Sequence, residues 1–370
     1  MRRFLHGKIA AAGAVLGLAS VVVFPPTPAA ADSTRAGQWY LGFLDVAGAH
    51  RYTEGAGVAI GLIDTGVDAS HPDLVGSILP GAATFAGATG DGRTDIDGHG
   101  TRMAGLIVGH GHGPDGSLGA LGIAPKATIL SVRVGTGGFD HSGIISGIEW
   151  ATEHGAKIIS ISSGSPFDDD RERRAIEDAI AHDVVVVAGA GNTPSTKVQY
   201  PAAYPGVLAV AGVDEQGNHG NFSVTGPGVM IAAPGANILT TVLNHEYNYA
   251  TGTSDSTAIV AGVAALVRSK FQDMSATEVI HRLTATAIDK GPPGRDNLYG
   301  YGIVNLVGAL TANVPPLSSS SAIPSTASAS APAAGGAATA VRIWLFVGLG
   351  VLVIVVVLGI ALTIRRRSAA

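Results

Sequence analysis

The chain contains no cysteine. That absence excludes disulfide bonds, zinc sites built on thiolates and catalysis by a cysteine nucleophile. Charged residues are scarce, at 14% of the sequence, and the formal net charge is −5 at pH 7. A chain without an excess of basic residues gives no indication of nucleic-acid binding. The function therefore rests on chemistry that needs neither a thiol nor a basic surface.

Apolar residues and glycine are abundant instead. Hydrophobic residues make up 46% of the 370 positions, enough for a sizeable core, and 52 glycines indicate many tight turns. This length suits one large domain with extensions, or two domains. The largest shifts in composition lie at the two ends of the chain.

The first 31 residues have the composition of a secretory signal peptide. Two arginines lie near the start, an apolar stretch runs from about Ile9 to Phe24, and small residues end at Ala31. An N-terminal membrane anchor is the alternative, but the apolar stretch is short, diluted by Gly and Ala, and followed by two prolines. We expect residues 1–31 to be removed by cleavage after Ala31.

The C-terminal part changes from a linker to an apolar segment. Residues 312–342 are rich in Ser, Ala and Pro, a composition that cannot form a packed core. Residues 343–364 carry no charge and, as a helix, are long enough to span a bilayer of roughly 30 Å. The tail, 365–370, begins with three arginines, which place it in the cytoplasm by the positive-inside rule. The sequence thus predicts a single-pass protein of the cell membrane, with the lipid bilayer as a partner of its C-terminal helix, the catalytic domain extracytoplasmic and the C-terminus cytoplasmic.

Between these ends, strand-like and helix-like segments alternate. The continuous apolar run 58–63 is typical of a buried parallel strand and ends at Asp64. Further strands are expected at 128–134, 157–162, 184–188 and 229–233, and helices at 101–108, 142–154, 170–182, after Ser254, at 275–287 and at 302–310. This alternation predicts an α/β fold with a doubly wound, mostly parallel sheet and helices on both faces. We assign 58–311 to this domain and 32–57 to an N-terminal extension packed on it.

Ser254 is the strongest candidate for a nucleophile. It follows a Gly-Thr turn and precedes the apolar run 258–267, so it lies at the start of a predicted helix, among unpaired N–H groups. That position suits a serine whose substrate becomes an oxyanion, although a lone serine before a helix is more often only an N-cap. Two other residues favour the catalytic interpretation of Ser254. They are Asp64, at the end of a predicted strand, and His99, in an Asp-Gly-His-Gly-Thr motif. The order Asp, His, Ser is that of subtilisin.

These and further motifs, in this order, resemble those of the subtilisin-like serine proteases over roughly residues 39–310. The motifs are Ile63–Asp68 with His71–Leu74, Asp97–Thr101, Gly122–Pro125, Val187–Asn192 with Tyr200–Ala202, and Gly252–Ser254. The signal peptide, the start at Gln38 and Trp39, the lack of a long prodomain and the terminal anchor are similar to the mycosins, membrane-anchored subtilases associated with type VII secretion. The resemblance implies a subtilisin-like fold and a serine endopeptidase.

The resemblance also assigns roles to the site residues. Ser254 would attack the peptide carbonyl, His99 would accept and then donate the proton, and Asp64 would orient the imidazole. Asn192 would form the oxyanion hole with the Ser254 N–H, although Gly-Asn is also a common turn. No cofactor is required for this chemistry. A protein or peptide substrate would lie extended beside 160–164. The small residues expected to line its site are Ser162, Ser163 and Gly164 on one wall and Ala188, Gly189 and Ala190 on the other.

The chain departs from the family pattern near Ser254. Ser256 and Ala258 occupy positions where most subtilases have Ala and Pro, and Asp255 stands where many have an apolar residue. We interpret Asp255 as a solvated carboxylate that favours the start of the helix and acts weakly on its neighbours, with at most a small rise in the His99 pKa. The mycosins also use disulfides, which this chain cannot form.

A structural calcium site is a further implication of the resemblance. Asp73 matches the calcium-binding carboxylate of the family, and residues 114–121 match the loop that supplies other oxygens, but Gly116 stands where a side-chain ligand is expected. The His-Gly-His segment 110–112 is interpreted as loop surface, and the charged run 171–174 as a solvated helix face.

Two functional hypotheses of different classes follow. The first is a membrane-tethered, extracytoplasmic serine endopeptidase that uses an Asp-His-Ser triad with an Asn oxyanion hole and is associated with type VII secretion. The second is a structural component of a secretion-system membrane complex, in which the protease fold serves as a docking body. A non-catalytic peptide-binding module is disfavoured, because all four catalytic positions are filled.

Overall fold

The structure, a computed structural model, describes residues 33–193 and 195–317. The chain divides into two units, Met1–Leu317 and Ser318–Ala370, and all described residues belong to the first. The predicted signal peptide, the linker from residue 318 onward, the apolar segment 343–364 and the tail 365–370 lie outside the described residues. Within 33–193 and 195–317, no helix is long and apolar enough to cross a membrane.

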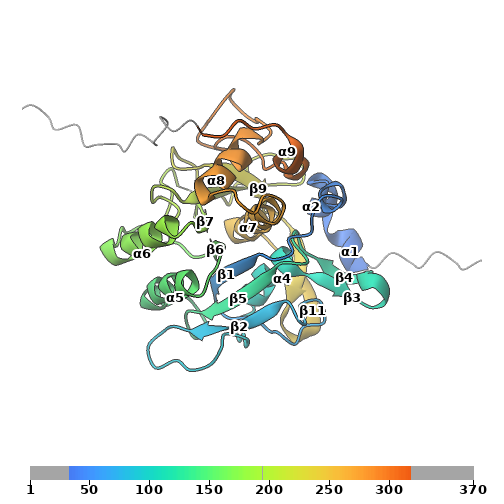
Figure 1. Ribbon diagram of the computed structural model, residues 1–370, viewed down its shortest axis with the longest axis vertical. Helices are drawn as coiled ribbons and strands as arrows, with labels where there is room; N and C mark the ends of the chain where they lie inside the picture. Colours follow the sequence, from blue (N-terminus) through green and yellow to red (C-terminus); the bar gives the residue numbers. More distant parts are fainter. Residues whose placement is uncertain (1–32, 194, 318–370) are drawn as a thin grey trace, which may run out of the picture. The chain divides into compact units, whose positions relative to one another are not determined.

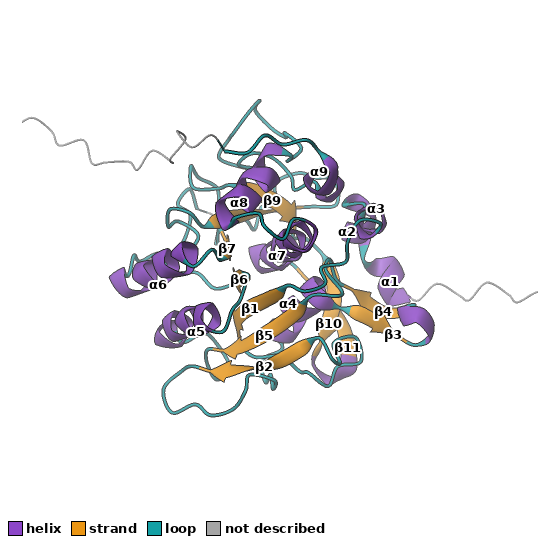
Figure 2. Cartoon of the chain, viewed as in Figure 1, coloured by secondary structure: helices purple, strands orange, loops and turns teal. Residues whose placement is uncertain are grey.

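A seven-stranded sheet forms the centre of this unit (Figures 1 and 2). In spatial order its strands are β2 (Ile78–Ala83), β5 (Thr128–Arg133), β1 (Ala59–Asp64), β6 (Ile158–Ile161), β7 (Val185–Gly189), β8 (Leu208–Val213) and β9 (Ile231–Pro234). Every pairing in this sheet is parallel; Ile63 of β1, for example, lies opposite Val132 of β5 and Ile161 of β6. The strand order changes direction at β1. Reversals of this kind bring binding sites to the carboxyl ends of the strands.

Helices cover both faces of the sheet. α4 (His99–Val108), α7 (Thr253–Lys270) and α8 (Ala276–Ala285) pack on one face, and α5 (His141–Glu153) and α6 (Asp170–Ala181) lie side by side on the other. The alternating side chains of β1 enter both cores: Ile60 and Leu62 pack with α4 and α7, and Ile63 packs with α5. The predicted doubly wound, parallel α/β fold is therefore confirmed.

α7 is buried from Thr253 to Arg268, and its middle, residues 258–267, is apolar on all sides. Its small residues allow close packing: a Cβ added at Gly262 would lie 2.7 Å from the side chain of Ile123. The cations Arg268 and Lys270 are confined to the last turn, where they complement the helix dipole. The dense packing fixes the start of α7, where Ser254 lies.

Two short antiparallel pairs flank the main sheet. β10 (Ile238–Val242) pairs with β11 (Glu246–Ala250) through a turn that contains the short helix η2 (Leu243–His245). β3 (His110–His112) pairs with β4 (Leu118–Leu121) around η1 (Pro114–Gly116). The first hairpin leads directly into α7 and so delivers the chain to Ser254.

The segment before β1 forms three short helices, α1 (Ser33–Gly37), α2 (Trp39–Phe43) and α3 (Val46–His50). Tyr40 has no exposed surface and belongs to the core that contains α4 and α7. The Gln38 side chain accepts a hydrogen bond from the Leu121 N–H at 2.8 Å and donates one to the Leu121 carbonyl at 3.0 Å. This segment therefore lies against the core that contains α4 and α7.

The last described helix, α9 (Leu306–Thr311), is shorter than the predicted helix at 302–310. Ile303 forms bridges with Ala232 and Ile288, which keep its backbone extended. Asn305 then caps the helix by accepting a hydrogen bond from the Gly308 N–H.

Candidate active site

Asp64, His99 and Ser254 come from three elements that meet at one edge of the sheet. Asp64 ends β1, His99 begins α4 and Ser254 is the second residue of α7. Two glycines permit the close approach of these elements. A Cβ on Gly100 would lie 1.9 Å from the Gly66 carbonyl oxygen, and Gly66 itself has φ +98°, which favours glycine.

The structure pairs Asp64 with His99. The His99 Nδ1–H donates to Asp64 Oδ1 at 2.7 Å, and the Thr65 N–H donates to the same oxygen at 2.8 Å. Asp64 is fully buried, whereas the His99 side chain is 25% exposed. Because an ionised carboxylate only accepts, Nδ1 carries the hydrogen and Nε2 is left to exchange a proton with substrate groups.

The charges around His99 favour its protonated form. Burial is the largest influence on its pKa and acts downward, but the charge and hydrogen bond of Asp64, with the charges of Asp255 and Asp97, outweigh it. The net result raises the pKa of His99 to about 9. The imidazole is therefore mostly protonated at neutral pH.

The Ser254 side chain points toward Ser162, the residue that directly follows strand β6. Its hydroxyl donates to the Ser162 carbonyl oxygen at 3.3 Å, and among the described residues it makes no hydrogen bond to His99. Catalytic hydrogen bonds are often long or misaligned before substrate binds. A rotation about the Cα–Cβ bond of Ser254 would turn the hydroxyl away from this carbonyl.

Asn192 is held by the turn that precedes Ser254. Its Oδ1 accepts hydrogen bonds from the Thr253 N–H at 2.7 Å and from the Thr253 hydroxyl at 2.9 Å. The carbonyl side of the amide is thus fixed, and the Nδ2 donors remain for another acceptor. A Cβ on Gly252 would lie 3.3 Å from Nδ2, so the glycine keeps the space beside this donor open.

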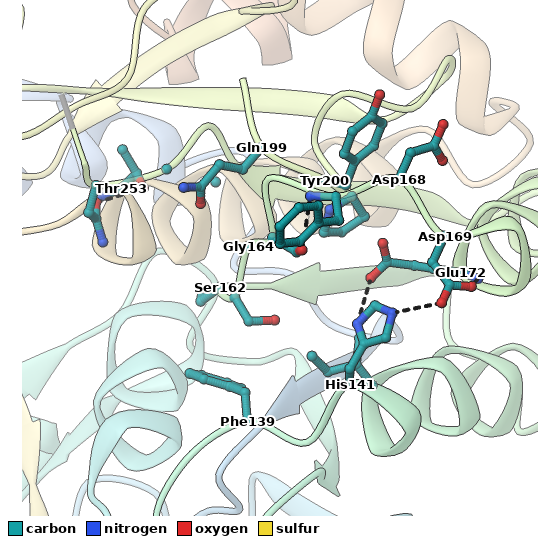
Figure 3. A pocket seen from close by; sticks show the side chains of 18 of the residues that line it. Phe139, His141, Ser162, Gly164, Asp168, Asp169, Glu172, Gln199, Tyr200 and Thr253 are labelled. Atoms are coloured by element: carbon teal, nitrogen blue, oxygen red, sulfur yellow. Dashed lines mark hydrogen bonds and ion pairs between the residues drawn. The ribbon is translucent and has the colours of Figure 1, made fainter. Parts of the chain in front are cut away.

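A cavity of about 690 Å³ opens beside these residues (Figure 3). Its lining includes Ser162, Asn192 and Thr253. The Ser162 carbonyl accepts the hydrogen bond from the Ser254 hydroxyl. Phe139 also lines it and contacts the His99 ring edge to face, with 5.5 Å between ring centroids. The cavity therefore adjoins Ser254 through Ser162 and His99 through Phe139.

Four of the six predicted wall residues line this cavity: Ser162, Ser163, Gly164 and Gly189. Ala188 and Ala190 do not line it, which corrects that prediction. Both are fully buried in the core under α5 and α6, because side chains alternate between the faces of β7 and its extension.

Other cavity residues were missed by the sequence reasoning. They are Phe139, His141, Ile144, Phe167, Asp168, Asp169, Glu172, Gln199 and Tyr200. Gln199 packs so closely on the wall that a Cβ on Gly164 would lie 2.4 Å from its Oε1. Glu172 is only 2% exposed, so the charged run 171–174 is not a wholly solvated helix face. Of these cavity residues, only the acidic cluster at 168–172 stands out in the sequence as a possible binding feature.

Asp255 is not solvated, contrary to the prediction. It is 2% exposed and forms a buried ion pair with Arg102, whose Nε lies 2.8 Å from Oδ1. Burial raises the pKa of Asp255, while the Arg102 charge and hydrogen bond oppose that rise. The prediction failed because α7 has no exposed face in its first turns. Ser256, at the other unusual position, donates to a β9 carbonyl at 3.1 Å.

The surroundings of Asp73 do not fit the expected calcium site. Asp73 is fully buried, its Oδ1 lies 2.6 Å from His112 Nδ1, and its Oδ2 accepts from the Ala120 N–H at 2.7 Å and from the Tyr247 hydroxyl at 2.9 Å. Calcium requires six or more oxygen ligands, but hydrogen-bond donors occupy this carboxylate. Across 33–193 and 195–317, no cluster of three or more His, Asp or Glu residues could hold a metal ion. His112 is thus an ion-pair partner rather than plain loop surface.

Comparisons with known proteins agree with this geometry. A family model described as the subtilase family matches residues 55–302. Subtilisin DY of Bacillus licheniformis is 38% identical over 262 residues, covering 69% of this chain and 92% of the relative. Subtilisin Savinase of Lederbergia lenta is 37% identical over 272 residues, covering 72% and 96%.

Solved structures are also similar to this chain, among them two of MycP1. The crystal structure of MycP1 with the N-terminal propeptide removed has a TM-score of 0.66 at 32% identity, covering 75% of this chain and 98% of that chain. MycP1 from Mycobacterium smegmatis has a TM-score of 0.66 at 30% identity, covering 78% and 88%.

Proposed function

Because the chain belongs to the subtilase family and is a serine endopeptidase, we propose that Asp64, His99 and Ser254 form its catalytic triad. The observation that carries this proposal is the 2.7 Å contact of His99 with the buried Asp64, beside a cavity that Ser254 adjoins through Ser162.

The reaction proceeds by acyl transfer to Ser254. Its Oγ attacks the scissile carbonyl carbon while His99 Nε2 takes the hydroxyl proton, and Asp64 stabilises the resulting imidazolium. The carbonyl oxygen becomes an oxyanion, which accepts hydrogen bonds from Asn192 Nδ2 and the Ser254 N–H. The C–N bond then breaks as His99 gives the proton to the leaving amine. Water, activated by the same imidazole, hydrolyses the acyl-enzyme.

The substrate is an extended peptide that lies along residues 162–164. Within the described part of the chain, no backbone-to-backbone hydrogen bond involves Ser163 or Gly164, so their polar groups are open to a peptide strand. Main-chain pairing of this kind holds many sequences, and selectivity comes from the cavity beside it.

We further propose that the peptidase is tethered to the cell membrane, with the catalytic domain extracytoplasmic and the C-terminus cytoplasmic. The signal-like residues 1–31, the uncharged segment 343–364 and the arginines in 365–370 support this arrangement. The sequence resemblance to the mycosins motivates an association with type VII secretion, and the likeness to MycP1 agrees with that resemblance. A second role as a structural component of the secretion complex is compatible with catalysis, because the segment before β1 adds surface to the peptidase core.

Labelling with a fluorophosphonate probe tests the catalytic proposal. The purified wild-type protein should take up the probe, and the Ser254→Ala variant should not. Labelling that persists in Ser254→Ala would place the nucleophile elsewhere. If the wild type took no probe and cleaved no peptide, yet secretion failed on deletion of the protein, the structural role would stand alone.

A further inference from the structure

The cavity beside the nucleophile has an acidic end that the triad chemistry does not use. It consists of Asp168, Asp169 and Glu172, around the start of α6, and of His141, the first residue of α5 (Figure 3). We refer to these four residues as the acidic end of the cavity.

Two of the three carboxylates already have partners within the chain. Asp168 is ion-paired with Arg173. Asp169 caps α6, and the hydrogen bonds from the N–H groups of the first helical turn, that of Arg171 first, lower its pKa to about 2. His141 Nε2 lies 3.3 Å from Asp169 Oδ2. Asp169 is therefore ionised, and the side chains of both residues are held in place by their partners.

Glu172 is different. It is 2% exposed, yet its Oε2 has no hydrogen-bond partner among the described residues. Its Oε1 lies 4.0 Å from His141 Nδ1, beyond hydrogen-bond distance. Burial raises the pKa of Glu172, and the His141 charge and the neighbouring Tyr204 hydroxyl act against that rise, although this hydroxyl donates its hydrogen to the Asp169 carbonyl oxygen. A buried carboxylate oxygen without a donor is costly, which indicates that a partner is supplied from outside.

A second unpartnered atom lies in the same cavity. The Ser163 hydroxyl oxygen is buried and has no hydrogen-bond partner in the described part of the chain. Aromatic and apolar side chains, Phe139, Ile144, Phe167 and Tyr200, line the cavity as well. Such surfaces hold the methylene stem of a long side chain and favour a cation at its end.

The cavity receives the part of the substrate that precedes the scissile bond. His99 protonates the leaving amine, so the part after that bond lies on the His99 side. A separate hollow of about 330 Å³ lies there, lined by His99, Leu243 and Tyr249. The 690 Å³ cavity does not include His99 and reaches Asn192, where the carbonyl oxygen of the acyl part is bound.

On the basis of the peptidase function given above, we propose that the acidic end binds the cationic side chain of a Lys or Arg residue N-terminal to the scissile bond. The ammonium or guanidinium group donates to Glu172 Oε2, the one carboxylate oxygen at this end that is buried without a donor. Asp168 and Asp169 are already paired with Arg173 and Arg171, so Glu172 is the carboxylate at this end that is left for the substrate cation. A short neutral side chain leaves Glu172 unpaired and is bound less well.

Paired peptides test the proposal. Each pair differs only in Lys against norleucine, which has a side chain of similar length without the charge, at one position before the scissile bond. For the wild type we expect the ratio of kcat/KM for Lys over norleucine to reach about tenfold or more at one position. Glu172→Gln should bring that ratio near one. The matched control is Glu177→Gln, on the same helix, exposed and outside the cavity, which should keep the wild-type ratio.

The ratio is taken within each variant, so a general loss of folding or activity does not imitate the expected result. A wild-type ratio near one at every position, or an unchanged ratio in Glu172→Gln, would overturn the proposal. If no peptide were cleaved, the peptidase mechanism would be at fault instead. The site would then be tested by fluorescence anisotropy with labelled peptide pairs and the Ser254→Ala protein, and equal affinity for both members would reject it.

Discussion

At the scale of single residues, the charge on His99 sets the pH range of catalysis. Only the neutral imidazole can accept the Ser254 proton, and the surrounding carboxylates hold the pKa of His99 at about 9. Asp255 contributes to this although it touches neither the imidazole nor the substrate. Its charge is buried with Arg102, so solvent screens it weakly.

We therefore expect kcat/KM to rise with pH and to level off only above a midpoint near 9, because the active fraction grows as His99 loses its proton. Asp255→Asn removes one of the charges that raise this pKa and should move the midpoint to lower pH. The measurement is a pH–rate profile with a neutral peptide. Asp170→Asn, which changes an exposed carboxylate on α6, is the control and should leave the midpoint in place. A midpoint that Asp255→Asn does not move would show that Asp255 has no electrostatic effect on the base.

Asn192 acts, in our proposal, through its free Nδ2 donors. Asn192→Ala should lower kcat by about 10²–10³-fold, the range given by removal of such a donor in subtilisin, with KM nearly unchanged. Asn192→Asp separates two roles, because it keeps an oxygen for Thr253 but has no N–H donor. Both variants should lose turnover in steady-state assays. Activity retained by Asn192→Asp alone would mean that Asn192 serves only to hold Thr253.

At the scale of elements, the ion pair between Arg102 and Asp255 ties α4 to α7. Arg102 also donates to the Asn248 carbonyl at 2.9 Å and to that of Ile238, so it binds the β10–β11 hairpin as well. The Arg102 guanidinium thus connects α4, which carries His99, with α7, which carries Ser254. It also binds the β10–β11 hairpin, which leads into α7. Asp73 and Tyr247 form a similar tie between the β11 strand and the loop before β2.

A double-mutant cycle measures the first of these ties. Asp255→Leu or Arg102→Met alone should lower the free energy of unfolding by about 3–5 kcal/mol, because each leaves a buried charge unpaired. The double variant should lose much less than the sum, since it leaves no such charge. Urea unfolding of the four proteins gives the coupling energy. Additive losses would show that the pair is not coupled, despite the short contact.

The elements themselves were largely predictable, whereas their contacts were not. The apolar run before Asp64 predicted β1, because a strand buried on both faces needs no polar alternation. The pairing of Arg102 with Asp255 joins residues 153 positions apart, and no local pattern encodes it. The burial of Glu172 was not predictable, because this residue belongs to a charged run of the kind typical of a solvated helix face. The prediction that Ala188 and Ala190 line the substrate site was wrong, because a sequence motif gives the identity of its residues but not the face of the strand on which their side chains lie.

At the scale of the whole molecule, our proposal for where catalysis takes place depends on the ends of the chain. The signal peptide and the membrane span are predicted from residues outside those described, and both remain predictions. They agree with each other, because a signal at one end and arginines after an apolar segment at the other both place the domain outside the cytoplasm.

Protease treatment of intact cells tests this arrangement. A soluble fragment that contains Ser254 and ends within 312–342 should be released, because that segment has the composition of an unfolded linker. A cytoplasmic marker protein should stay intact in the same samples. Protection of the fragment until the cells are lysed would reverse the proposed topology.

In the proposed extracytoplasmic location, the peptidase would meet copies of itself, and the burial of α7 would limit where they can cut it. Backbone that opens locally is cleaved first, and backbone that opens only on global unfolding is cleaved last. α7 is buried from Thr253 to Arg268, so its amide hydrogens would exchange with solvent only when the entire domain opens. Self-digestion would begin instead in exposed loops such as the one at Phe167, which is 77% exposed and lines the cavity. An ageing population of this enzyme would thus lose its selectivity before it loses its reactive serine.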